Sequence, residues 1–201
     1  MPAVALTRTS EPPLDELTLR RAQRGDERAW RALVARHGPP VHALIWRLLV
    51  GRARHRVEDL VQETFVRVLR ALPAFDPQGA ASLSTWMLTI ATRLALNELR
   101  RPEPQPLEID LEAHDRTDGD AERRRLGNAI AAGVAALPDA QRVVFVLREY
   151  HGLDYAELAG AIEVDLGTIK SRLARARTAL RAHLITALPE LGELGELGER
   201  T

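Results

Sequence analysis

Apolar residues recur with the period of an α-helix along almost the whole chain, and no stretch shows the alternation of a β-strand. In the first half this pattern predicts a series of consecutive helices. They run from Asp26 to a break at Pro39-Pro40, from Val41 over a stripe that reaches Leu49, over residues 57–72, and from a cap at Ser82 or Ser84 to Arg101. The predicted fold class is therefore all-α.

The segment 102–120 interrupts the helical pattern. Three prolines stand at its start, and residues 103–122 hold eight acidic residues against one base, Arg116. Prolines, like charges and few apolar residues favour an extended chain that does not pack. We therefore predict a disordered N-terminus (1–13), a small helical domain (14–101), an acidic flexible linker (102–120), a second small helical domain (121–185) and a solvated tail (186–201).

Residues 154–177 carry the most informative pattern in the chain. Asp154 can cap a short helix, and Glu157 three residues later completes a capping box. Asp165 can cap a second helix. This second helix has no acidic residue from Leu166 to Pro189, and its cations are Lys170, Arg172, Arg175, Arg177 and Arg181. A short helix followed by a basic helix predicts a helix-turn-helix unit, in which the second helix enters the DNA major groove.

A polar patch is predicted on the helix over residues 57–72. Asp59, Gln62 and Glu63 are spaced so that their side chains share one helical face. The patch could bind a partner, but an ordinary solvated face of an amphipathic helix produces the same pattern. The spacing by itself does not separate the two interpretations.

A second patch is predicted on the helix that ends at Arg101. Arg93, Asn97, Arg100 and Arg101 share a face and suit phosphates or base edges. The two terminal arginines are also explained by the negative end of the helix dipole. Near the start of the same helix, Trp86 could stack on an unpaired base or belong to the core.

Charge and composition narrow the classes of function. The chain has 28 basic and 28 acidic residues, but their basic–acidic–basic order suits nucleic-acid binding better than the zero net charge does.

The absence of cysteine excludes disulfides and cysteine-based sites, and it fits a reducing compartment. Neither a signal peptide nor a run of the roughly 20 apolar residues of a membrane span is recognised. The six histidines are scattered, so we predict no metal, no cofactor and no enzymatic activity.

Several blocks of the sequence stand in a characteristic order between Asp15 and Leu184. They are Asp59 to Phe65; Phe75-Asp76 to Ser84-Thr85-Trp86; Ile90-Ala91, Asn97 and Leu99 to Arg101; Leu137-Pro138 to Leu147-Arg148-Glu149; Gly152-Leu153; and Gly167 to Leu173 with Arg175 to Arg177. Together they resemble the extracytoplasmic-function (ECF) sigma factors, the small two-domain specificity subunits of bacterial RNA polymerase. The first domain resembles sigma region 2, and the second resembles sigma region 4.

This resemblance implies three interfaces and no catalysis. Core polymerase would contact Asp59, Gln62, Glu63 and Phe65. The melted minus-ten element would contact Ser84, Trp86, Arg93, Asn97, Arg100 and Arg101. The minus-thirty-five element would contact Arg148, Thr168, Lys170, Ser171, Arg172, Arg175 and Arg177. The acidic linker would thread the polymerase cleft toward the RNA exit path.

At three positions the chain departs from the family pattern. Arg93 stands where members often have Asn, Asp165 where the turn often has Pro, and Ala174 where a bulky DNA-contacting residue is frequent. Because Arg is longer than Asn and cationic, we expect a different base preference around Arg93. Asp is the better helix cap, so the change at Asp165 is not expected to disturb the fold.

The resemblance also implies partners and a location. It implies binding to core RNA polymerase, promoter DNA and an anti-sigma factor, in the cytoplasm, by a free protein that is a monomer with mobile domains. Two alternatives stay open from the residues alone. A dimeric helix-turn-helix regulator would bind palindromic DNA without core polymerase, and a helical adaptor would bind only protein.

Overall fold

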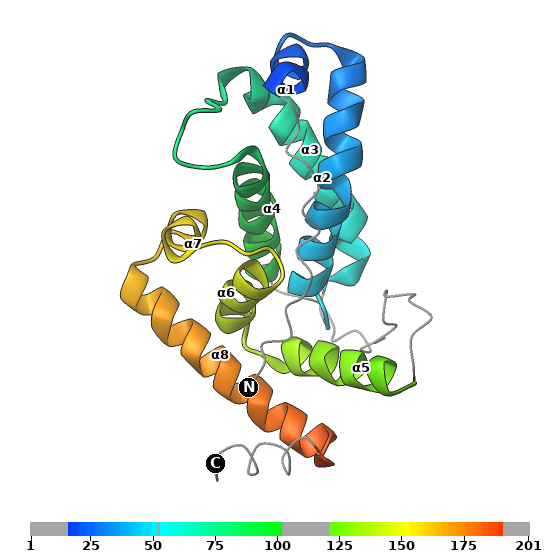
Figure 1. Cartoon of the computed structure of the whole chain (residues 1–201), viewed down its shortest axis with the longest axis vertical. Coiled ribbons are helices and arrows are strands. Elements are labelled where there is room, and N and C mark those ends of the chain that lie inside the picture. The colour runs from blue at the N-terminus through cyan, green and yellow to red at the C-terminus, as the bar shows by residue number, and fades with distance from the viewer. Residues whose placement is uncertain (1–15, 52, 102–120, 191–201) are drawn as a thin grey trace.

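The computed structural model describes residues 16–51, 53–101 and 121–190 (Figure 1). These residues form α-helices and two short 3-10 turns, with no β-strand among them, which confirms the all-α prediction. The segment 1–13, the linker 102–120 and the tail beyond Glu190 lie outside the described residues, and the boundaries predicted for them stay predictions. No helix within the described ranges is long and apolar enough to cross a membrane.

The first half of the molecule is built from α1 (Glu16–Gln23), α2 (Glu27–Leu48), α3 (Val57–Ala71) and α4 (Leu83–Leu99). The 3-10 turns Arg54–Arg56 and Leu72–Ala74 flank α3. Asp26 caps α2 as predicted, since its carboxylate accepts from the backbone N–H of Ala29 at 2.9 Å. Ser82, and not Ser84, caps α4, because its hydroxyl oxygen accepts from the backbone N–H of Thr85 at 3.1 Å.

The predicted break at Pro39-Pro40 is wrong, because α2 continues through both prolines. A proline inside a helix costs about 3 kcal/mol. The stripe on either side of the prolines includes Leu33, Val41 and Leu44, which are fully buried, and each such side chain contributes about 1.5–3 kcal/mol on burial. Burial therefore outweighs the local penalty. Gly38, which precedes the prolines, also lacks the Cβ that would clash with the following ring.

The second half contains α5 (Ala121–Ala136), α6 (Asp139–Glu149), α7 (Tyr155–Ile162) and α8 (Leu166–Ala187). The capping box before α7 is present in both directions: the N–H of Glu157 donates to Asp154 at 2.8 Å, and the N–H of Asp154 donates to Glu157 at 2.8 Å. Gly133 lets α5 approach α8, because a Cβ there would lie 2.4 Å from a methyl group of Leu180. The predicted helix-turn-helix unit is therefore formed by α7 and α8.

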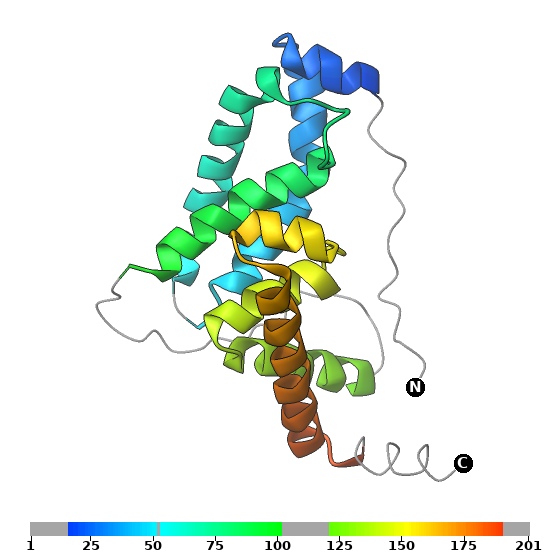
Figure 2. The same cartoon turned by 90° about the vertical axis from the view of Figure 1, so that its left-hand side faces the viewer.

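The first half (α1 to α4) and the second half (α5 to α8) pack against each other, which differs from the predicted mobile domains. One continuous hydrophobic cluster includes Leu44 and Leu48 of α2, Leu94 of α4 and Val144 of α6. The physical reason lies in α6, where every residue from Arg142 to Leu147 is buried. Successive residues point to different sides of a helix, so a run of six buried residues needs cover on all sides. In the structure α2 supplies part of that cover, while α7 packs against α4 (Figure 1, Figure 2).

Candidate nucleic-acid interface

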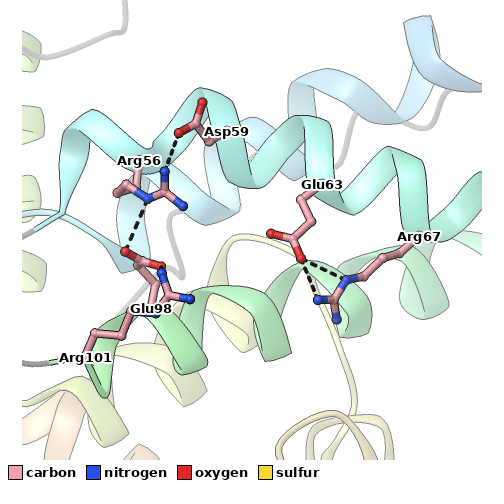
Figure 3. Close-up of polar contacts among 6 residues, drawn as sticks. All are labelled: Arg56, Asp59, Glu63, Arg67, Glu98 and Arg101. Atoms are coloured by element: carbon pink, nitrogen blue, oxygen red, sulfur yellow. Dashed lines mark hydrogen bonds and ion pairs between the residues drawn. The ribbon is translucent and has the colours of Figure 1, made fainter.

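The predicted polymerase-binding patch lies on the exposed side of α3. The Asp59 side chain is 59% exposed and accepts from Arg56. The Glu63 side chain is 43% exposed and accepts from Arg67, with 2.5 Å to Nη2 and 3.1 Å to Nε. Figure 3 shows that the two carboxylates engage different arginines. Exposed ion pairs of this kind contribute at most about 1 kcal/mol, so a partner can displace either arginine. Gln62 is also exposed.

Phe65 is half-buried and belongs to a different surface from the carboxylates. Its ring meets Trp30 edge to face, with 6.2 Å between the ring centroids. It lines an apolar groove of about 1060 Å³ between α2, α3 and α5. Val66 and Leu69 of α3 also line this groove, with 45% and 48% of their surface exposed. The sequence pattern did not predict the groove, because its walls come from helices far apart in the chain.

A carboxylate on α4 joins the polymerase-binding patch to the predicted DNA-binding residues. Glu98 accepts from Arg56 Nε at 3.3 Å and from Arg101 Nη1 at 3.0 Å (Figure 3). Its side chain is only 11% exposed. Spacing could have indicated the contact with Arg101, three residues away. No local signal indicates the contact with Arg56.

The first turns of α4 hold the predicted minus-ten residues Ser84 and Trp86. Both are half-buried. The Trp86 ring packs on Phe75 with 4.9 Å between the ring centroids, and both rings border the smaller hydrophobic cluster formed by α1 to α4. Trp86 is therefore a core aromatic in this structure. Its half-buried position leaves part of the ring surface for a contact with a base.

Farther along α4 and directly after its last residue, Arg93, Asn97, Arg100 and Arg101 are all exposed, but their side chains do not form one row. Arg100 donates to the side-chain oxygen of Asn97 at 3.3 Å. Arg101 is turned toward Glu98. Arg93 instead reaches out of the first half, and its guanidinium lies 3.0 Å from the carboxylate of Glu163 at the end of α7.

The start of α8 is fixed by its cap. Asp165 accepts from the backbone N–H of Thr168 at 2.8 Å and from its hydroxyl at 2.6 Å. These bonds, the hydroxyl first, hold the pKa of the Asp165 carboxyl below its ordinary value. The Ser171 hydroxyl is turned back to the carbonyl of Thr168 at 3.0 Å. Thr168 and Ser171 therefore sit in the first turns of α8 with their hydroxyl groups already engaged.

The basic residues of the helix-turn-helix unit divide into free and engaged side chains. Lys170, Arg172 and Arg175 have no ion pair within the part of the chain that the structure describes. Arg177 donates to Glu149 at 2.6 Å. Arg148 donates to the carbonyl of Leu153 at 2.7 Å and stacks over the Tyr155 ring, so it fastens the turn between α6 and α7.

Comparison with protein families gives two matches in the order that the sequence predicts. Residues 33–103 match the model of sigma-70 region 2, and residues 128–180 match the model of sigma-70 region 4. The chain is 32% identical to the ECF RNA polymerase sigma-E factor of Salmonella typhimurium in an alignment of 186 residues that covers 85% of this chain and 94% of that protein.

Solved structures show the same fold. CnrH, in a complex with the cytosolic domain of CnrY, superposes with a TM-score of 0.60 at 25% identity over 85% of this chain and 96% of CnrH. The sigma factor RpoE of Bartonella quintana, in a complex with the anti-sigma factor NepR, superposes with a TM-score of 0.58 at 22% identity over 77% of this chain and 95% of that one. The chain belongs to the family of ECF RNA polymerase sigma factors.

Proposed function

We propose that this ECF sigma factor divides promoter recognition among three surfaces. The polar patch of α3, with Phe65 beside it, would bind core polymerase. The exposed side of α4 would hold the melted minus-ten element, and α8 would bind the minus-thirty-five duplex. The protein would act by binding DNA and polymerase, without catalysing a reaction of its own, and it would work in the cytoplasm as a monomer when free.

The observation that carries this proposal is the set of cations on α8, of which Arg172 and Arg175 share one side of the helix. Lys170, Arg172 and Arg175 project from a helix that has no acidic residue and that is capped at the position where a recognition helix begins. Cations without an ion pair bind phosphates and base edges at little cost in broken contacts. A solvated helix face would normally mix charges of both signs.

The engaged residues refine the predicted assignments. Arg148 and Arg177 hold α6, α7 and α8 together through Leu153 and Glu149, so they would position the recognition helix at least as much as they touch DNA. Arg172 and Arg175 would carry the direct readout. The proposal therefore ranks these two arginines above Arg148 and Arg177 for base specificity.

The ranking can be tested on duplex DNA. The duplex would be selected from a random pool by the protein bound to core polymerase, and binding would be measured as a function of salt. Arg172→Ala and Arg175→Ala should each weaken binding by about 1–3 kcal/mol if they touch base edges. Arg181→Ala, an exposed cation farther along α8, is the matched control. Equal losses in all three variants would contradict a sequence-reading role for Arg172 and Arg175.

We further propose control by an anti-sigma factor that lays a helix in the apolar groove beside α3. The groove exposes Val66 and Leu69 next to the proposed core-binding patch, and an amphipathic helix buries its apolar face in such a groove. CnrH was solved with the cytosolic domain of CnrY, which supports a protein ligand for this fold. Val66→Asp should abolish inhibition by the anti-sigma factor, whereas inhibition that survives this change would place the inhibitor elsewhere.

A further inference from the structure

α7, the first helix of the helix-turn-helix unit, packs against α4 and contacts Arg93, whose side chain stays 50% exposed. The guanidinium of Arg93 donates from Nη2 to the carbonyl of Gly160 at 3.2 Å and from Nε to the carbonyl of Ala161 at 3.4 Å. With the ion pair to Glu163, one side chain of the first half binds two carbonyls at the C-terminal end of α7 and the carboxylate that follows them. The two helices lie side by side in both views (Figure 1, Figure 2).

The acceptors at the end of α7 resemble those of a nucleic-acid strand. The last carbonyls of a helix lack partners within the helix and carry partial negative charge. Glu163 adds a full negative charge at the C-cap, where its backbone is left-handed with φ of 58°. A guanidinium favours carboxylate and phosphate oxygens alike. The end of α7 therefore offers Arg93 the kind of oxygen ligands that a sugar-phosphate backbone would supply.

A second contact fastens the opposite end of α7 to the same helix. The buried hydroxyl of Thr85 donates to the carboxylate of Glu157 at 2.9 Å. Glu157 uses its other oxygen for the capping box of α7. Thr85 and Arg93 are about two helical turns apart, so α7 is attached near both of its ends along one face of α4.

A buried arginine on α6, Arg142, also joins the two halves. Arg142 of α6 is 6% exposed. Its Nη1 donates to the carbonyl of Leu48 at 3.0 Å, at the end of α2, and its Nη2 donates to the carbonyls of Ala135 and Leu137 at 2.8 Å each. One guanidinium therefore binds terminal carbonyls of helices from both halves. This contact between α6 and α2 holds the second half, which includes α7, in place against the first half.

We propose that the helix-turn-helix half is an intramolecular inhibitor of the α4 face. In the closed protein α7 occupies the part of this surface beside Arg93, and Arg93 is bound to the carbonyls of α7 and to Glu163. In the open protein Arg93 exchanges these ligands for the strand. The inference rests on the proposed role of α4, and it adds a competitor for that surface within the same chain.

The test separates opening of the protein from binding of the strand. The chain has no cysteine, so Ala35→Cys and Ala156→Cys, both at exposed positions, take spin labels at two defined sites. Their distance distribution would be compared between the protein and the variant Thr85→Val with Glu163→Gln. Glu27→Gln, which removes the same charge from an exposed residue of α2, is the control. Binding of a labelled random-sequence single strand to each protein would be measured in parallel.

The inference predicts one narrow distance for the protein and the control, and longer or broader distances for the double variant. The double variant should also bind the single strand about fivefold more tightly, because a closed population lowers the apparent affinity. Unchanged distances would overturn the closed state and leave the proposed function standing. Longer distances with unchanged strand binding would overturn the competition between α7 and the strand and would leave the proposed role of α4 standing. If the double variant fails to fold, the spin-label distances and the affinity for the single strand are measured on Glu163→Gln alone, with the same expected results.

Discussion

Arg56 donates to Glu98 at 3.3 Å, although 42 positions separate these residues along the chain. The bond joins the start of α3 to the last turn of α4. Because Arg56 also pairs with Asp59 and Glu98 also pairs with Arg101, one connected network of charges lies between the proposed polymerase-binding and minus-ten surfaces. The two surfaces therefore share charged partners.

Glu98→Gln should lower the free energy of unfolding by about 1–2 kcal/mol, because a poorly exposed carboxylate that serves two arginines loses its charge. Urea denaturation measures this change. Glu16→Gln, which affects an exposed pair with Arg20 on α1, should change stability by less than about 1 kcal/mol. Equal effects of the two changes would show that the Glu98 network adds nothing beyond a surface ion pair.

Asp59→Ala combined with Gln62→Ala should weaken assembly with core polymerase by about tenfold, since a loss of 1.4 kcal/mol at an interface corresponds to that factor. Both side chains are exposed, so thermal unfolding should be unchanged. Glu58→Ala, at an exposed position of the same helix, serves as the control in a fluorescence titration with core. Wild-type affinity in the double variant would remove this face of α3 from the interface.

Arg142→Met should destabilise the protein by about 2–4 kcal/mol, because buried carbonyls at the ends of α2 and α5 lose a charged donor. Arg177→Met, whose partner Glu149 is reached across an exposed surface, should cost less than about 1 kcal/mol. Chemical denaturation compares the two. A loss at Arg142 no larger than that at Arg177 would mean that the guanidinium does not hold the halves together.

His151 makes stability depend on pH. Burial and then the charge of Arg47 lower the pKa of the His151 imidazole from 6.5 to about 4. Between these values the unfolded chain binds more protons than the folded one, so stability is fully present above pH 6.5 and is lost as the pH falls toward 4. The loss should be about 2–3 kcal/mol. His151→Phe should flatten the curve in this window, whereas His55→Phe, at an exposed site, should leave it as it is.

Contacts between residues that are close in the sequence could be predicted. The caps at Asp26, Asp154 and Asp165 depend on partners three residues away, and all three are present. The exposed polar positions of α3, α4 and α8 follow from helical periodicity in the same way. Spacing alone therefore indicated these caps and the polar side chains that are available to partners.

The contacts between distant segments could not be predicted. The continuation of α2 through Pro39-Pro40 depends on the burial of apolar side chains in the packed protein. The engagement of Arg93 with α7 and of Arg142 with α2 depends on how the halves dock. These residues look like ordinary surface cations in the sequence, and their partners lie 67 and 94 positions away.

Promoter opening by the reconstituted enzyme would show whether this protein directs initiation as a sigma factor. Permanganate reactivity of thymines would be followed on a promoter fragment with core polymerase alone, with this protein alone and with both, and with the Asn97→Ala variant in place of the protein. We expect reactive thymines only when both components are present, and fewer of them with Asn97→Ala at unchanged duplex binding. Tight binding to palindromic duplex without core, together with no reactive thymines when core is present, would show instead that the protein is a dimeric DNA-binding regulator.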